Sequence, residues 1–168
     1  ADLDNAIDAS INGRILNTGQ SCISAKRLIV TKPVYHEFLD KLKNKLSEKI
    51  MGDPMDKVDI GPMVSIVARD EVHDQVERSI NSGASLELGG QIPNLEGAFY
   101  PITLISDVRP GMAAFDEEIF GPVFTLILAE DEAHAIKLSN QTPFGLGAAI
   151  FTKDIKKGEY IAKNKLNA

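Results

Sequence analysis

VFTLIL, at residues 123–128, is the stretch that decides the fold of this chain. Five apolar residues and one threonine follow one another without the polar alternation of a strand that has one solvated face. Such a run predicts a strand buried on both faces, which is typical of a parallel sheet. Because both faces then need cover, we expect helices to flank this sheet.

Amphipathic helices are expected on both sides of this strand in the sequence. Within residues 35–50, apolar side chains recur at spacings of four, three, four and four, and Pro33 suits the first turn of a helix. Two further apolar stripes predict helices around residues 7–15 and 72–80. Residues 133–138 predict a short helix, and the last residues begin another.

Shorter apolar segments complete the predicted sheet. We expect strands at residues 28–30, 86–88, 99–105 and 148–151, with Pro101 marking an edge or a bulge in the third. Strands and helices therefore alternate along the chain. This alternation predicts an α/β architecture with a largely parallel sheet flanked by helices.

Composition excludes several classes of protein. The 168 residues carry a formal net charge of −6 and no Lys/Arg cluster, which argues against nucleic acid or an anionic membrane as a partner. No apolar run approaches the roughly 20 residues that span a bilayer, and the first residues do not resemble a signal peptide. A single cysteine excludes an intrachain disulfide and favours a cytoplasmic location.

That cysteine, Cys22, is the first candidate for chemistry. It ends the segment NTGQSC at residues 17–22. A lone cysteine is commonly a small buried hydrophobe, but a polar turn between a helix and a strand is where an exposed nucleophilic thiol can be held. Backbone N–H groups of the turn could stabilise an oxyanion beside the sulfur. Lys26 and Arg27 could favour the thiolate or be plain surface charges.

Two later segments carry candidate binding groups. EEIFGP, at residues 117–122, is either a solvated turn or a carboxylate that binds sugar hydroxyls beside an aromatic ring. PFGLG, at residues 143–147, lacks the third glycine of a dinucleotide-binding fingerprint and precedes a predicted strand instead of following one. The three histidines are far apart and show no metal-ligand spacing, so we expect no metal site.

Three motifs together resemble the aldehyde dehydrogenase superfamily in their order and spacing. They are Asn17-x-Gly19-Gln20-x-Cys22, Glu118-x-Phe120-Gly121-Pro122 and Pro143-Phe144-Gly145-Leu146. The resemblance covers essentially the whole chain. It implies that residues 1–168 form the cysteine-bearing catalytic domain, a three-layer α/β fold truncated at both ends, without the cofactor-binding domain. Within the family, residues 19–27 and 69–73 look most like bacterial succinate-semialdehyde dehydrogenases.

The resemblance also implies a mechanism. The thiolate of Cys22 attacks an aldehyde, hydride passes to NAD or NADP, and water hydrolyses the resulting thioester to a carboxylic acid. The N–H of Cys22 would form part of the oxyanion hole, Glu118 would bind the nicotinamide ribose, and Phe120 would pack near the nicotinamide. The implied partner is a small aldehyde such as succinic semialdehyde, with no nucleic acid or membrane. The full-length enzyme would be a homodimer or homotetramer, and the isolated chain inactive.

One segment mimics another family motif. ELGG, at residues 87–90, has the letters of the family's general-base segment, but it follows Cys22 where that segment precedes the cysteine. We therefore expect Glu87 to be a structural or surface residue.

Two other function classes remain open. A stand-alone thiol hydrolase or peroxidase could use Cys22, although no histidine lies near it in the sequence. A non-catalytic interaction module would leave the order of the three motifs unexplained.

Overall fold

The structure is a computed structural model that describes residues 1–167. Its helices and strands follow one another along the chain in this order: α1 (Leu3–Ile15), the 3₁₀ turn η1 (Leu16–Gly19), β1 (Arg27–Thr31), α2 (Lys32–Ser47), α3 (Ile66–Asn81), β2 (Ser85–Leu88), β3 (Thr103–Ser106), α4 (Ala113–Asp116), β4 (Val123–Ala129), α5 (Glu132–Asn140) and α6 (Ile155–Asn164).

The four strands form one sheet in the order β1-β4-β3-β2. β4 contains the VFTLIL segment and pairs in parallel with β1 on one side and β3 on the other. β2 pairs antiparallel with β3 at the edge. The predicted buried strand is thus an inner strand of a mostly parallel sheet, and the predicted fold class is confirmed.

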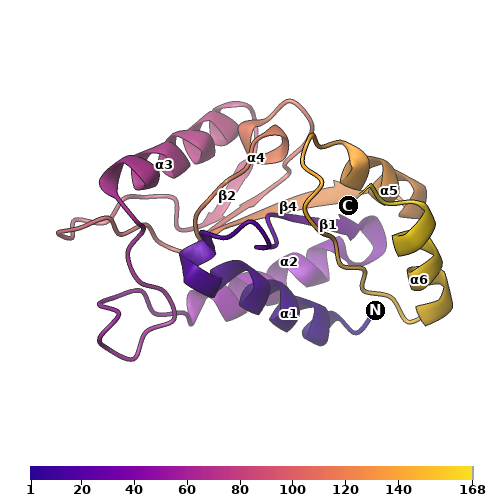
Figure 1. The fold of residues 1–168 in the computed structure, drawn as a ribbon, viewed down its shortest axis with the longest axis horizontal. Coiled ribbons are helices and arrows are strands. Elements are labelled where there is room, and N and C mark those ends of the chain that lie inside the picture. The colour runs from indigo at the N-terminus through magenta and orange to yellow at the C-terminus, as the bar shows by residue number, and fades with distance from the viewer. Residues whose placement is uncertain (168) are drawn as a thin grey trace.

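Helices cover both faces of the sheet and give three layers (Figure 1). α1 and α2 lie on one face, and α3, α4 and α5 lie on the other. Alternate residues of β4 enter the two resulting cores: Phe124 packs with the α1–α2 core, and Val123 and Ile127 pack with the opposite one. The unbroken apolar run of β4 follows from this two-sided burial.

Two predicted boundaries shift in the structure. α2 ends at Ser47, so Ile50, the last residue of the predicted stripe, lies beyond the helix and is exposed. The strand predicted over residues 99–105 starts later, at Thr103 of β3, because Pro101 lacks the N–H that a ladder hydrogen bond needs.

The strand predicted at residues 148–151 is wrong. This stretch pairs with none of the strands in the described part of the chain, and most of it is exposed. A short apolar segment has the same sequence pattern whether or not a second strand lies beside it. A strand needs such a neighbouring strand to bind its backbone N–H and C=O groups. The helix expected after it is confirmed as α6.

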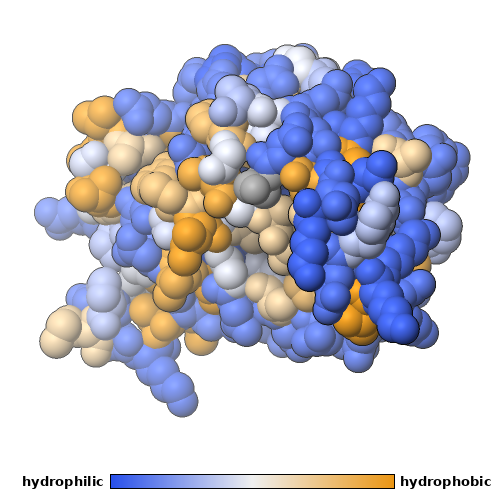
Figure 2. Space-filling view, turned by 45° about the vertical axis from the view of Figure 1, so that its right-hand side comes forward, coloured by the Kyte–Doolittle hydropathy of each residue, from blue (hydrophilic) through white to orange (hydrophobic). Residues whose placement is uncertain are grey.

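The surface is divided between apolar and hydrophilic areas on the face drawn in Figure 2, where apolar side chains gather on the left of the view. Ile23, Met55 and Val64 are among the most exposed large apolar residues. Within residues 1–167, every helix is too short or too polar to cross a membrane.

Candidate active site

Cys22 lies exposed on a loop that leads from η1 into β1. Three successive residues before it, Asn17, Thr18 and Gly19, have positive φ angles of 52°, 55° and 75°. For residues other than glycine this conformation costs on the order of 1–3 kcal/mol each, so the surroundings must hold it. The side-chain amide of Asn17 donates to the backbone carbonyl of Gln20 at 2.9 Å, and the side-chain amide of Gln20 donates to the backbone carbonyl of Asn17 at 3.2 Å.

Gly19 brings the cysteine loop against the second motif. A Cβ at this position would overlap the backbone carbonyl of Gly121, so only glycine permits the approach. The side-chain oxygen of Gln20 accepts the N–H of Val64 at 2.8 Å and ties the loop to the start of the α3 region. Two motifs that are about a hundred residues apart in sequence are therefore in backbone contact.

Arg14 of α1 also joins the cysteine loop to the second motif. The interpretation of the sequence did not single out this residue. Its side chain is fully buried. Nη1 donates to Ser24 Oγ at 2.9 Å, Nη2 to the carbonyl of Ile119 at 2.9 Å, and Nε to the carbonyl of Val123 at 2.6 Å. Burial lowers the pKa of Arg14 to about 9, against the attraction of the nearby Glu118 carboxylate, so the side chain stays charged at neutral pH.

A sequence signal for Arg14 was present. It follows Ile7 and Ile11 at spacings of four and three, which places it on the apolar stripe of α1. A charged residue on a buried stripe must find polar partners. Here those partners are backbone and side-chain oxygens of the site.

Lys26 joins all three residues that the sequence singled out. Its ammonium donates to the carbonyl of Cys22 at 2.9 Å, pairs with Glu118 Oε1 at 2.9 Å, and lies 5.5 Å from the centre of the Phe120 ring. It also donates to the carbonyls of Ser21 and Ser24 at 2.9 and 3.4 Å. With 13% of its side chain exposed, Lys26 is not a plain surface charge.

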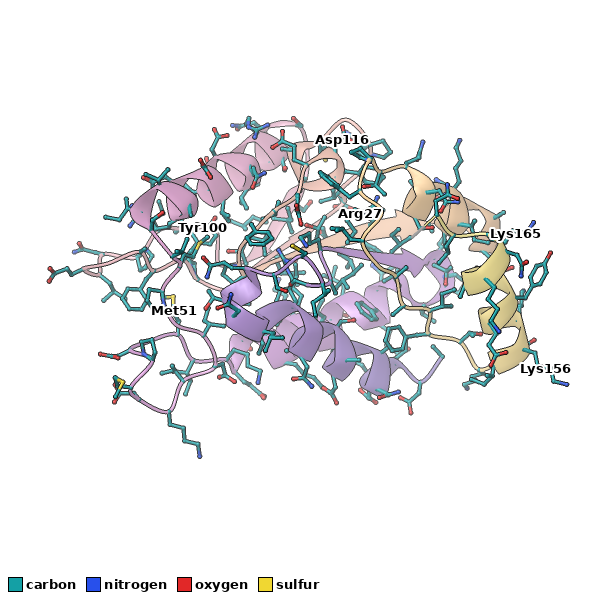
Figure 3. All side chains as sticks on the ribbon, in the orientation of Figure 1. Arg27, Met51, Tyr100, Asp116, Lys156 and Lys165 are labelled. Atoms are coloured by element: carbon teal, nitrogen blue, oxygen red, sulfur yellow. The ribbon has the colours of Figure 1, made fainter. Side chains whose placement is uncertain are left out.

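Arg27 is also not a free surface charge. Its guanidinium donates to the carbonyls of Leu138, Ser139 and Gln141 at the end of α5, at 3.0–3.3 Å, and lies 5.2 Å from the Phe115 ring. Figure 3 labels Arg27 and Asp116. Burial lowers its pKa, and the charge of Asp116 opposes that shift. Arg27 therefore anchors the end of α5 through backbone carbonyls.

The adjacent carboxylates Glu117 and Glu118 are in different surroundings. Glu117 forms two hydrogen bonds with Arg78, at 2.7 and 2.9 Å, which lower the pKa of Glu117 to about 2. Glu118 Oε1 is buried beside Lys26 in an ion pair, but no donor in the described chain meets it in hydrogen-bonding geometry. Glu118 thus has acceptor capacity that the described residues do not use.

A cavity of about 340 Å³ lies between α3 and this segment. Its size falls in the range of small-molecule sites. Glu118 and the partly exposed Phe120 form one wall, and Val72 and Gln75 of α3 face them. A carboxylate with unused hydrogen-bond acceptor capacity beside an aromatic ring fits a group that has both hydroxyls and a flat surface, such as a nucleoside.

The third motif remains apart from the site. Phe144 and Leu146 are exposed, and no hydrogen bond links their segment to the cysteine loop in the described residues. Glu87 lies on β2, at the sheet edge opposite β1, and binds Lys43 and Ser106 at 2.9 and 2.7 Å, as expected of a structural residue. Residues 1–167 contain no cluster of three or more His, Cys, Asp or Glu that could hold a metal ion.

The fold and the site define an α/β protein with an exposed cysteine on a hydrogen-bonded loop, and Gln20 of the same loop lines a cavity of about 340 Å³. Comparison with known proteins gives the family. The model of the aldehyde dehydrogenase family matches residues 1–166, and this chain belongs to that family.

Similar proteins include two bacterial succinate-semialdehyde dehydrogenases. The NADP(+) enzyme of Deinococcus radiodurans is 40% identical over 163 residues, which cover 96% of this chain and 34% of the relative. The NAD(P)+ enzyme of Escherichia coli is 42% identical over 163 residues, covering 96% and 35%. The chain thus spans about a third of the length of these relatives.

A solved structure with a similar fold is betaine aldehyde dehydrogenase from Staphylococcus aureus in complex with NAD+. It is 31% identical to this chain, with a TM-score of 0.93 over 99% of this chain and 34% of that one. The three-layer arrangement predicted for the catalytic domain is therefore confirmed.

Proposed function

We propose that residues 1–168 are the cysteine-bearing part of an NAD(P)-dependent aldehyde dehydrogenase that oxidises succinic semialdehyde to a carboxylic acid. The observation that carries this proposal is the convergence of Cys22, Glu118 and Phe120 on one ammonium group, that of Lys26. Family membership supports the reaction class, and the names of the two relatives support the substrate and the cofactor.

Cys22 is the proposed nucleophile. Cys22 is exposed on a loop that Arg14 and Gly19 hold in place, which suits a thiol that must meet a carbonyl compound. Attack by the thiolate gives a tetrahedral oxyanion, which the backbone N–H of Cys22 is proposed to stabilise. Hydrolysis of the later thioester then frees the cysteine.

Glu118 and Phe120 are the proposed contacts to the cofactor. The unused acceptor capacity of Glu118 suits two ribose hydroxyls, and the Phe120 ring at the cavity wall suits the flat nicotinamide end. When bound, NAD or NADP supplies the hydride acceptor. The role of Glu118 is to hold the ribose, which fixes the distance from the cofactor to the Cys22 sulfur.

The remaining parts of the enzyme belong to the same proposal. The cofactor-binding domain, the general base and the second oxyanion donor lie outside these 168 residues, and the full-length enzyme is a cytoplasmic homodimer or homotetramer. The 168-residue chain by itself is then inactive in aldehyde oxidation, because the groups proposed to hold the dinucleotide and to activate water lie outside it.

A thiol hydrolase or peroxidase is a weaker candidate for this site. Such an enzyme needs a base beside the sulfur. The histidine hydrogen bonds in residues 1–167 join His73 to Tyr100 and His134 to Glu130 and Asp131, and none of them involves Cys22.

Substitution of Cys22 in the full-length enzyme tests the proposal. Cys22→Ala should abolish reduction of NADP by succinic semialdehyde while leaving cofactor affinity nearly unchanged, measured by nicotinamide absorbance and by calorimetric titration. Ser47→Ala, an exposed position at the end of α2, is the matched control and should keep full activity. Turnover that persists in Cys22→Ala would overturn the proposed mechanism.

Substitution of Glu118 tests the proposed cofactor contact separately. Glu118→Gln should slow hydride transfer in a single turnover more than it weakens cofactor binding, because the carboxylate positions the ribose. Glu48→Gln, an exposed residue beyond α2, is the matched control. Unchanged single-turnover kinetics in Glu118→Gln would show that Glu118 has no such role.

A further inference from the structure

The peptide bond between Ser21 and Cys22 is held by its carbonyl group. Lys26 Nζ donates to the Ser21 oxygen at 2.9 Å, and the backbone N–H of Ser24 donates to the same oxygen at 3.2 Å. The described chain contains no cis peptide bond, so the Ser21 C=O and the Cys22 N–H point in opposite directions across one rigid plane. Fixing the carbonyl therefore fixes the direction of the Cys22 N–H.

The Cys22 N–H itself is free. It donates to no acceptor among the described residues, and Cys22 is exposed. A donor left open beside an exposed thiol can bind an oxygen that develops charge next to the sulfur.

We propose that Lys26 is a positioning residue for oxyanion stabilisation at Cys22. Its ammonium holds the Ser21–Cys22 peptide by the carbonyl end, and the Cys22 N–H at the other end donates to the oxygen of a carbonyl compound under attack. The proposal rests on Cys22 being the nucleophile, as in the proposed function.

Charge strengthens this arrangement. A hydrogen bond from an ammonium is roughly twice as strong as one between neutral groups, and it polarises the peptide so that the N–H at the other end becomes a better donor. The effect depends on Lys26 staying in place. Glu118 and the carbonyls of Cys22 and Ser24 surround the ammonium and hold it there.

The same ammonium links the two halves of the proposed site. Glu118 and the Ser21 carbonyl are both 2.9 Å from Lys26 Nζ. A ligand that binds to the Glu118 carboxylate therefore acts on the group that orients the Cys22 N–H. The proposed nucleophile, Cys22, and the carboxylate proposed to bind the cofactor, Glu118, are therefore linked through the side chain of Lys26.

Two reactions of Cys22 separate this role from a general effect on the thiol. With p-nitrophenyl acetate, the sulfur bonds to the carbonyl carbon, the C=O electron pair moves to oxygen, and collapse of this oxyanion expels p-nitrophenolate and leaves an acetyl thioester. With iodoacetamide, the sulfur displaces iodide from carbon and no oxyanion forms. Both reactions depend on the thiolate, but only the first needs an oxyanion donor.

The experiment measures both rates in the 168-residue chain, with Lys26→Met as the variant. Lys32→Met is the matched control, since Lys32 forms an exposed ion pair with Glu130 at 2.7 Å, away from the site. Circular dichroism checks folding of each variant. If Lys26→Met does not fold, Lys26→Gln replaces it, since this side chain keeps an N–H donor but not the charge.

We expect Lys26→Met to slow acylation by about tenfold, less than the 10²–10³-fold that follows loss of an oxyanion donor outright. Alkylation should stay within about twofold of the original rate, and Lys32→Met should change neither reaction. Parallel loss of both rates, or no loss in acylation, would overturn the proposal. So would an unsubstituted chain that is alkylated but not acylated. Failure of the full-length enzyme to reduce NADP would instead count against the proposed function alone.

Discussion

The cysteine loop, residues 17–26, and the segment at residues 141–152 are both irregular, but they differ in how they are held. In the first, Arg14 and Lys26 bind three oxygens of the loop, those of Ser24 Oγ and of the Ser21 and Cys22 carbonyls, each at 2.9 Å. Arg14 also binds the carbonyls of Ile119 and Val123 at 2.9 and 2.6 Å and so ties the loop to the second motif. The second is largely exposed: Arg27 donates to the carbonyl of Gln141 at its start, and beyond that residue the hydrogen bonds are short-range, such as Phe144 N–H to Thr142 Oγ1. A defined geometry without regular secondary structure thus depends on buried cationic side chains that bind backbone oxygens.

This difference coincides with the chemistry. The candidate nucleophile and the candidate ribose ligand are both in or against the loop that is held, while no hydrogen bond joins the exposed segment to either of them in residues 1–167. Reacting groups need fixed positions, and the structure supplies them only in the first region. Substitutions in the two regions should therefore have very different effects.

The largest expected effect is that of Gly19→Ala. A Cβ at this residue overlaps the Gly121 carbonyl, and the φ of 75° is strained for alanine. We expect a loss of about 4 kcal/mol in the free energy of unfolding. Urea titration of the chain measures it.

Gly147→Ala is the control for this substitution in the other segment. No atom lies within 4 Å of the added Cβ, so the free energy of unfolding should change by less than about 1 kcal/mol. Equal losses at Gly19 and Gly147 would contradict the difference between the two regions.

Arg14→Met comes next in size. It leaves Ser24 Oγ and the carbonyls of Ile119 and Val123 buried without this donor. Unsatisfied buried groups cost about 1–3 kcal/mol, and we expect a total loss of about 3 kcal/mol together with slower reaction of Cys22 with p-nitrophenyl acetate. Arg109→Met, at an exposed arginine, should stay within about 0.5 kcal/mol. A stable Arg14→Met chain would mean that the loop is held by other contacts.

Acid should weaken the contact between α3 and the second motif. The pKa of Glu117 in the folded state is about 2, below the ordinary 4.5, because of its hydrogen bonds to Arg78. The stabilisation is therefore fully present above about pH 4.5 and is lost as the pH falls towards 2. Since both side chains are well exposed, the effect should be below about 1 kcal/mol.

Urea titrations between pH 2.5 and 6 measure this effect. Glu117→Gln should flatten the fall in unfolding free energy, and Glu48→Gln should leave it unchanged. A profile that Glu117→Gln does not alter would show that the Arg78 pair contributes nothing to folding.

The smallest effect is expected in the exposed segment. Phe144 and Leu146 are 40% and 49% exposed, so Phe144→Ser and Leu146→Ser should each change the unfolding free energy of the 168-residue chain by less than about 0.5 kcal/mol. Differential scanning calorimetry can compare them with Phe115→Ser in the core. Large losses at Phe144 or Leu146 would show that this segment packs more firmly than its exposure indicates.

Much of the fold follows from local sequence patterns. The six residues of VFTLIL and the apolar stripe over residues 35–50 predict an inner strand and a covering helix, because burial on two faces and on one face leaves different periodicities. Residues 148–151 show the limit of this reasoning. Their letters suit a strand, but the presence of a neighbouring strand is decided by the whole sheet.

The site shows a second limit. Its motif residues could be chosen from the sequence, but the partners of the side chains that hold them could not. Arg14 binds the carbonyls of Ile119 and Val123, which are more than a hundred residues away in the sequence. Lys26 is four residues from Cys22, yet it pairs with Glu118, which lies far along the chain. Such pairs depend on tertiary structure, which no spacing along the chain reveals.

The most direct test of the central claim is to trap the covalent acyl-enzyme intermediate on Cys22. The full-length enzyme is mixed with ¹³C-labelled succinic semialdehyde and NADP, quenched in acid during turnover, and analysed by peptide mass spectrometry. We predict a labelled acyl group on Cys22 that hydroxylamine removes, as expected of a thioester. Turnover of the aldehyde with no label on Cys22, or with the label on another residue, would contradict this account.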